Sequence, residues 1–149
     1  MKYITEVLIE RPLKETTELF DDPNNLAKWQ PGLKSIELLE GKQGREGAKT
    51  KMVYESKRGD LVMTEEITHR NLPDEFHAIY RASGVRNEMY NYFTAEGKQA
   101  TRWKTISVFR FRGMMAMMSL FMRNAFRKQT LLNMEAFKAF AEQAEKTGS

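Results

Sequence analysis

The chain has 149 residues, no cysteine, and a net charge of +4 from 24 basic and 20 acidic residues. This length predicts one domain, residues 1–149, with a core that needs no disulfides, and the lack of cysteine excludes a disulfide framework and a thiolate metal site. The mixed charge favours a solvated surface, so we expect no nucleic-acid partner. An early acid and the lack of an apolar stretch argue against a signal peptide at the N-terminus, and we expect a cytoplasmic protein.

The first part of the chain predicts one strand followed by two short helices. Apolar and polar residues alternate from Lys2 to Arg11, as in a half-buried strand. Residues 14–20 then predict a short helix. Asp22 is expected to cap a second one, with Pro23 at its first position, and this helix presents Trp29.

Six further strands are expected, separated by short turns in which glycine is frequent. They are residues 33–41, 48–57, 60–70, 75–83, 85–96 and 99–111. Because the connections are short, neighbouring strands should pair as antiparallel hairpins.

The side chains assigned to the inner face of this sheet mix aromatic rings with polar groups. The polar and tyrosine members are Thr50, Tyr54, Ser56, Glu65, Tyr80, Thr105 and Ser107. A solid core would leave many of these atoms without partners, so they favour a cavity in which water or a polar ligand group meets them. The alternative is that the alternation is shifted by one residue, a question left open for residues 33–41, 60–70 and 85–96.

The last quarter of the chain, from Gly113 to about Lys146, predicts one long amphipathic helix. Its expected apolar stripe consists of Met114, Met118, Phe121, Ala125, Leu132, Ala136 and Ala139, widened on one side by Met122, Phe126, Phe137 and Phe140. The methionines in its first turns fit an adjustable cavity wall, ordinary core filling, or docking on a membrane surface. Basic residues at 123, 127 and 128 interrupt the apolar run, so we expect no integral membrane segment.

The order of elements and two short segments resemble a known superfamily. The segments are residues 20–25 (Phe-Asp-Asp-Pro-Asn-Asn) and 29–32 (Trp-Gln-Pro-Gly), followed by Glu-Gly-Lys at 40–42. They resemble the SRPBCC (START/Bet v 1-like) superfamily, in its bacterial polyketide cyclase/dehydrase and lipid-transport branch. The resemblance implies an α+β helix-grip fold, in which a seven-stranded curved antiparallel sheet wraps around a long C-terminal helix, with two short helices between strands 1 and 2. It also implies an apolar pocket for lipids, sterols or polyketides, and, in a minority of members, cyclisation or dehydration.

Recognisable catalytic or metal-binding motifs are scarce. Glycines 41, 44 and 47 lack the Gly-Lys-Ser/Thr ending of a phosphate loop and indicate a hairpin. His69 and His77 have no recognisable set of partner ligands, so we expect no metal site. Glu65 is the candidate catalytic residue, because a buried carboxyl beside aromatic rings can have a raised pKa and act as an acid or base; pairing with an arginine is the alternative.

The sequence therefore predicts a protein that binds a hydrophobic small molecule (a lipid, polyketide or aromatic metabolite) in an apolar cavity, as a carrier or sensor. The expected ligand-binding residues are Trp29, Tyr54, Glu65, Tyr80, Trp103, Phe109, Met117, Met118 and Phe121. One alternative is a metal-free enzyme of the cyclase or dehydratase kind, and another is a module that presents its Met-rich turns to a protein partner, as co-chaperones of the superfamily do. No cofactor is expected, and either a monomer or a homodimer fits.

Overall fold

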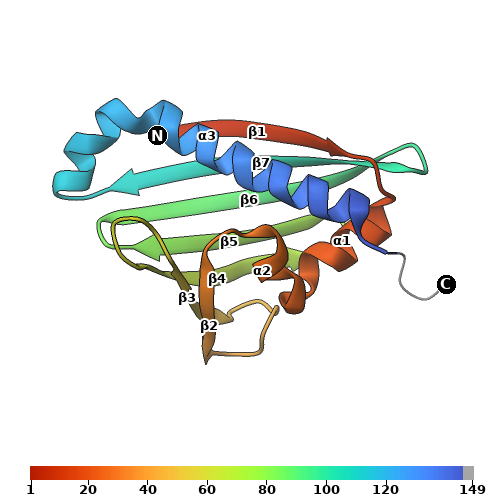
Figure 1. The fold of residues 1–149 in the computed structure, drawn as a ribbon, viewed down its shortest axis with the longest axis horizontal. Coiled ribbons are helices and arrows are strands. Elements are labelled where there is room, and N and C mark those ends of the chain that lie inside the picture. The colour runs from red at the N-terminus through yellow and green to blue at the C-terminus, as the bar shows by residue number, and fades with distance from the viewer. Residues whose placement is uncertain (146–149) are drawn as a thin grey trace.

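A computed structural model describes residues 1–145, which form one sheet and one long helix with short helices at one end (Figure 1). No helix in this range is long and apolar enough to cross a membrane. In chain order the elements are β1 (Lys2–Ile9), α1 (Leu13–Asp21), η1 (Pro23–Asn25), α2 (Leu26–Trp29), β2 (Leu33–Glu40), β3 (Lys49–Tyr54), β4 (Leu61–Asn71), β5 (Glu75–Ala82), β6 (Val85–Glu96), β7 (Ala100–Phe111) and α3 (Met114–Gln143).

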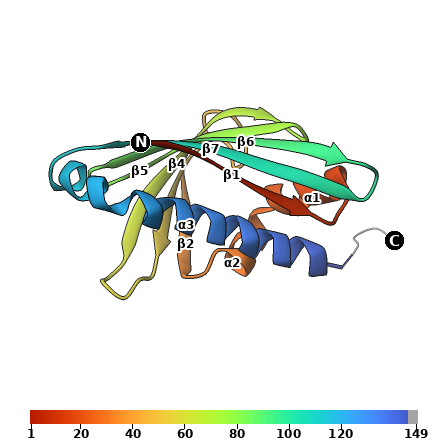
Figure 2. The same cartoon turned by 90° about the horizontal axis from the view of Figure 1, so that it is seen from above.

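The seven strands form one antiparallel sheet in the order β1-β7-β6-β5-β4-β3-β2. Strands β2 to β7 are successive hairpins, and β1 pairs with β7 at the far edge. Figure 2 shows α3 on one face of this sheet, with α1 and α2 beside the C-terminal half of α3. The expected helix-grip architecture is confirmed.

Most element boundaries lie within two residues of the expected ones, and the difference in β3 affects a predicted inner-face residue. Strand β3 ends at Tyr54, so Ser56 lies in the turn before β4, where its hydroxyl donates to the Gly59 carbonyl oxygen at 2.5 Å. Helix α3 ends at Gln143, and residue 146, the expected end, lies outside the described residues. The predicted cap is confirmed, because the Asp22 carboxylate accepts a hydrogen bond from the Asn24 backbone N–H at 2.9 Å.

Contacts with β1 hold α3 in place along its length. The hydroxyl of Tyr3 lies 2.8 Å from that of Thr130, and Thr5 Oγ1 donates to the sulfur of Met134 at 3.1 Å. At the C-terminal end, the buried guanidinium of Arg11 donates to the carbonyl oxygen of Ala141 at 2.7 Å. A cation there satisfies carbonyls that the helix itself leaves unpaired and complements the helix dipole.

The side of α3 that faces the sheet is not the stripe expected from the sequence. The buried residues are Ser119, Thr130, Met134, Phe137 and Ala141, and Met115, Met122 and Phe126 are half-buried. Met114, Met118, Phe121 and Leu132 of the expected stripe are exposed. Small or hydroxyl-bearing residues face β1 because they allow close approach and pair with hydroxyls such as that of Tyr3.

The end of the molecule beside α1 and α2 is a solid aromatic core. The ring of Phe20 lies at its centre, with ring centroids of five neighbours 5.1–6.2 Å away. These neighbours come from α2, three strands and α3: Trp29, Phe76, Phe93, Trp103 and Phe137. All five are at least 90% buried, which leaves no room for a ligand at this end.

Candidate functional site

A row of polar side chains crosses the inner face of the sheet, away from the aromatic core. The strand register aligns Thr50 of β3 with Glu65 of β4, Glu65 with Tyr80 of β5, and Tyr80 with Asn87 of β6. Residues paired in this way point to the same face of a sheet. Glu65 therefore lies on the inner face, as predicted. The row ends at Phe109 of β7, which pairs with Asn87.

The centre of this row is a carboxyl group that has a tyrosine partner. The hydroxyl of Tyr80 donates to Glu65 Oε2 at 2.7 Å. Burial raises the pKa of the Glu65 carboxyl, and the Tyr80 hydrogen bond offsets only part of this effect. Burial and the nearby carboxylate also raise the pKa of Tyr80. A carboxyl with a raised pKa can bind a polar ligand group or exchange a proton with it.

A second tyrosine adjoins this pair. Burial, followed by the charge of Glu65, raises the pKa of Tyr54. Its hydroxyl donates to Gln30 Oε1, just after α2, at 2.5 Å. Tyr54 thus links the polar row to the segment that connects α2 with β2.

Two buried oxygen atoms near the row have no hydrogen-bond partner within residues 1–145. They are Asn87 Oδ1 and Ser107 Oγ, on neighbouring strands β6 and β7. By contrast, Oδ1 of Asn91, farther along β6, accepts hydrogen bonds from Trp103 Nε1 at 2.9 Å and from the Thr105 hydroxyl at 2.7 Å. A buried oxygen without a partner destabilises the protein unless water or a ligand reaches it. Ser107 is 0% exposed and lies opposite Tyr3, whose hydroxyl is near enough to serve as its partner, so Asn87 is the candidate ligand contact.

Apolar side chains border the polar row on the helix side. Phe126 of α3 packs on Phe109, with ring centroids 5.1 Å apart, and on Phe111 at 5.3 Å. Met122, one turn earlier in α3, is half-buried. The row therefore begins on β3, next to the edge strand β2, and ends beneath the first half of α3.

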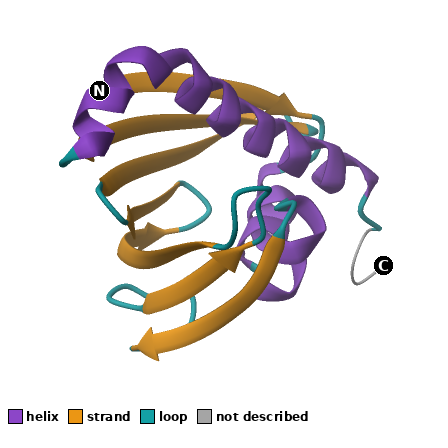
Figure 3. Ribbon diagram, turned by 60° about the vertical axis from the view of Figure 1, so that its left-hand side comes forward, coloured by secondary structure: helices purple, strands orange, loops and turns teal. Residues whose placement is uncertain are grey.

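This part of the inner face is only partly covered by α3, whereas the sequence predicts an apolar cavity enclosed between the sheet and the helix. Figure 3 shows α3 following β1 while the sheet bends away from it toward β2. Glu65, Tyr80 and Asn87 each keep partial exposure. Helix α3 covers the inner face only over β1 and β7. The candidate site, over the strands that α3 leaves uncovered, is therefore a half-exposed concave surface with polar groups at its centre.

Of the nine residues predicted to bind a ligand, Tyr54, Glu65 and Tyr80 lie together, and Phe109 lies at the far end of the same row, 8% exposed beneath Phe126. Trp29 and Trp103 lie in the solid aromatic core.

The other three predicted residues, Met117, Met118 and Phe121, are exposed on the side of α3 away from the sheet. Sequence reasoning missed Asn87 and the half-buried Met115, and it placed Met122 and Phe126 on the widened apolar side of the helix without assigning them to the site. The alternation of Met89 and Phe93 with polar residues in β6 is the signal that places Asn87 inward.

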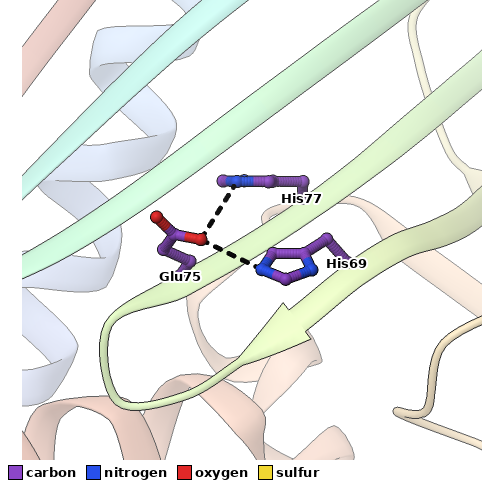
Figure 4. A group of neighbouring side chains, drawn as sticks. All are labelled: His69, Glu75 and His77. Atoms are coloured by element: carbon purple, nitrogen blue, oxygen red, sulfur yellow. Dashed lines mark hydrogen bonds and ion pairs between the residues drawn. The ribbon is translucent and has the colours of Figure 1, made fainter.

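The outer face carries a separate cluster of two histidines and a glutamate (Figure 4). Glu75 Oε2 lies 3.0 Å from His69 Nε2 and 3.7 Å from His77 Nε2. The sequence analysis expected no set of partner ligands around these histidines, and this expectation is wrong. A register shift in the pairing of β4 with β5 places His69 opposite His77. The three side chains offer ligand atoms within 4.8 Å of one another, a spacing at which a metal ion could be held.

The hydrogen bonding of His77 argues against metal binding by all three side chains. The Asn91 backbone N–H donates to His77 Nδ1 at 3.2 Å, so neutral His77 carries its proton on Nε2, the nitrogen that faces Glu75. Burial lowers the pKa of His77, which favours that neutral form. A metal ion would have to displace the Nε2 proton, so the cluster is better described as two imidazoles around one carboxylate. A neighbouring hollow of about 170 Å³, lined by residues that include Ile79, Glu88 and Tyr90, is smaller than most ligand pockets.

The fold was compared with solved structures. A conserved protein from Geobacillus kaustophilus superposes with a TM-score of 0.79 at 17% identity, covering 95% of each chain. An aromatase/cyclase from a Streptomyces species gives 0.78 at 13% identity, covering 100% of this chain and 98% of the other. A START superfamily protein from Mycobacterium smegmatis gives 0.73 at 14% identity, covering 95% and 97%.

The chain has the helix-grip fold of the START/Bet v 1-like proteins. The sequence itself matches no protein-family model and no curated protein. At these identities the likeness concerns the helix-grip fold alone, and the site has to be argued from its own residues.

Proposed function

We propose that this protein binds a hydrophobic small molecule on the half-exposed inner face of its sheet, as a carrier or sensor. The observation that carries the proposal is the row of Glu65, Tyr80 and Asn87, which lies among apolar side chains and ends in an unpartnered acceptor. Binding sites for apolar molecules combine a mainly apolar lining with a few placed polar groups, which is the composition found here.

The polar groups specify the kind of ligand within this broad class. Asn87 Oδ1 has no donor within residues 1–145, and the Glu65 carboxyl is partnered only by a tyrosine hydroxyl. A ligand that carries a hydroxyl or phenol group can donate to these oxygens while its apolar part contacts Met122 and Phe126. Solved helix-grip structures that include a START superfamily protein and an aromatase/cyclase are consistent with such a ligand.

The proposal is tested by ligand screening and by native mass spectrometry of freshly purified protein. Lipids, sterols and aromatic polyketides with and without a free hydroxyl group are screened for an increase in thermal stability. We expect hydroxyl-bearing hits that Asn87→Leu weakens about tenfold, the effect of losing one good hydrogen bond. Replacement of Leu39, an exposed residue of β2, by serine is the control and should leave the hits unchanged. A broad panel without any hit would count against the proposal.

Acid–base catalysis on such a ligand is the second candidate function, and the raised pKa of Glu65 favours it. Glu65→Gln keeps an oxygen that can accept the Tyr80 hydrogen bond but cannot transfer a proton. A carrier should bind its ligand nearly as well after this change. An enzyme of the cyclase or dehydratase kind should lose turnover and keep binding.

A further inference from the structure

The first two turns of α3 present an apolar face to solvent. Met114, Met117, Met118 and Phe121 follow the i, i+3, i+4, i+7 spacing of one helix face, and they are 80%, 69%, 39% and 87% exposed. Leu120 beside them is 78% exposed. The opposite side of the same turns faces the sheet, so the fold does not account for this second apolar face. A contiguous patch of this kind marks a site of interaction.

The apolar face is held rigidly by contacts on the other side of the helix. Met115 lies against Gly84 in the turn between β5 and β6, and the Arg112 N–H donates to the Gly84 carbonyl at 2.9 Å. Phe126 packs on Phe109 about three turns further along α3 than Met115. Rotation of α3 to bury Phe121 would break these contacts, so its exposure is a property of the folded state.

Positive charge surrounds this apolar face. The sequence from Gly97 to Met134 contains no aspartate or glutamate. Four basic side chains in or just before the first half of α3 are exposed: Arg112, Arg123, Arg127 and Lys128. Arg123 also donates a hydrogen bond to the Lys2 carbonyl oxygen at 3.1 Å. Within residues 1–145 none of the four forms an ion pair, although most of the chain's other arginines do.

We propose that this surface, the exposed side chains of residues 112–128, docks on an anionic lipid bilayer. The exposed methionines and Phe121 would enter the boundary between headgroups and acyl chains, and the four cations would lie near the phosphates. A second copy of the chain fits less well, because a symmetric contact would bring two such sets of cations together. The side chains expected to enter the bilayer are exposed, whereas the proposed ligand contacts Met122 and Phe126 are half-buried on the side of α3 that faces the sheet, so docking and ligand binding use different side chains.

The test is cosedimentation of the full chain with lipid vesicles. One preparation is phosphatidylcholine alone, and the other contains phosphatidylglycerol as well. We expect binding to the anionic vesicles only, and weaker binding when the salt concentration is raised, because salt screens the attraction. Met117→Ser with Phe121→Ser should reduce binding at least about tenfold, since it removes the apolar anchors.

A matched double variant provides the control. Leu39→Ser with Leu132→Ser removes two apolar side chains of about 50% exposure, one on β2 and one farther along α3. It should bind vesicles as the unmodified protein does, and both double variants should keep the thermal unfolding temperature because all four positions are exposed. The proposal is wrong if anionic vesicles do not sediment the protein, if Met117→Ser with Phe121→Ser binds unchanged, or if that variant abolishes only a dimer seen by light scattering.

Discussion

Gly84 lies against Met115, and this contact joins the turn between β5 and β6 to the start of α3. A Cβ atom at Gly84 would lie 3.1 Å from Met115 Cγ and 3.2 Å from the carbonyl oxygen of Arg112. The backbone φ of Gly84 is +73°, a region that favours glycine. Two separate requirements therefore select glycine here: the backbone conformation and the close approach of the helix.

Gly84→Ala should lower the free energy of unfolding by about 2 to 3 kcal/mol, the sum of backbone strain and crowding. Gly97→Ala is the matched control, because Gly97 has a φ of +71° but no atom within 4 Å of a Cβ placed there. Gly97→Ala should lower the free energy of unfolding by only about 1 kcal/mol. Urea unfolding of both variants measures the difference, and equal losses would contradict a supporting role for the Gly84–Met115 contact.

The raised pKa of Glu65 makes the stability of the fold depend on pH. A carboxyl whose pKa is raised in the folded state contributes most stability when it is protonated, below its pKa in the unfolded chain, and this contribution is lost as the pH rises through the folded-state pKa. Glu65→Gln should therefore be more stable than the unmodified protein at pH 8, and the difference should shrink toward pH 4. Thermal unfolding across this range measures it.

The adjacent Glu66 is the control for this measurement, because its pKa is shifted in the opposite direction. Its carboxylate accepts a hydrogen bond from Arg81 at 2.8 Å, which lowers the pKa of Glu66. Its contribution to stability is present at neutral pH and is lost on acidification. Glu66→Gln should therefore be less stable than the unmodified protein at pH 8, with a difference that also shrinks toward low pH. Parallel behaviour of the two variants would argue against the burial of the Glu65 carboxyl.

Asn87 and Asn91 lie on the same face of β6 but should respond oppositely to replacement by leucine. Asn91→Leu leaves Trp103 Nε1 and the Thr105 hydroxyl without their acceptor. It should therefore lower the free energy of unfolding by about 2 to 4 kcal/mol. Asn87→Leu removes an oxygen that has no partner, and should leave stability unchanged or raise it by about 1 kcal/mol. Chemical unfolding of both variants tests this. A large loss for Asn87→Leu would show that its side chain has a structural partner.

Much of the fold could be predicted because its signals are local. Glycine-rich turns between alternating segments predict a run of hairpins, and the Asp22–Pro23 pair predicts the start of a short helix. The inward position of Glu65 is the preferred interpretation of residues 60–70, but their alternation leaves the side open. The strand order β1-β7-β6 came only from the superfamily resemblance, because β1 pairs with a strand about 100 residues away and no local pattern specifies that pairing.

The details of the candidate site depend on contacts that the hydrophobic periodicity of the sequence does not specify. Helix α3 is apolar on two sides in its first turns, so a helical wheel cannot tell which side meets the sheet. The choice is made by Ser119 and Thr130, whose small size and hydroxyls suit the approach to β1. The pairing of His69 with His77 likewise depends on a register shift in β4 that the residue spacing does not reveal.

Phe137 and Phe121 test which side of α3 is buried. Phe137 is 0% exposed, with its ring centroid 5.0 Å from that of Trp29, so Phe137→Ala should cost about 3 to 5 kcal/mol by opening a cavity in the aromatic core. Phe121 is 87% exposed, and Phe121→Ala should change the free energy of unfolding by less than about 0.5 kcal/mol. Urea unfolding of the two variants compares them directly. If Phe121→Ala cost as much as Phe137→Ala, α3 would be rotated about its axis from the position described, and the exposed Met-rich face would be part of the core.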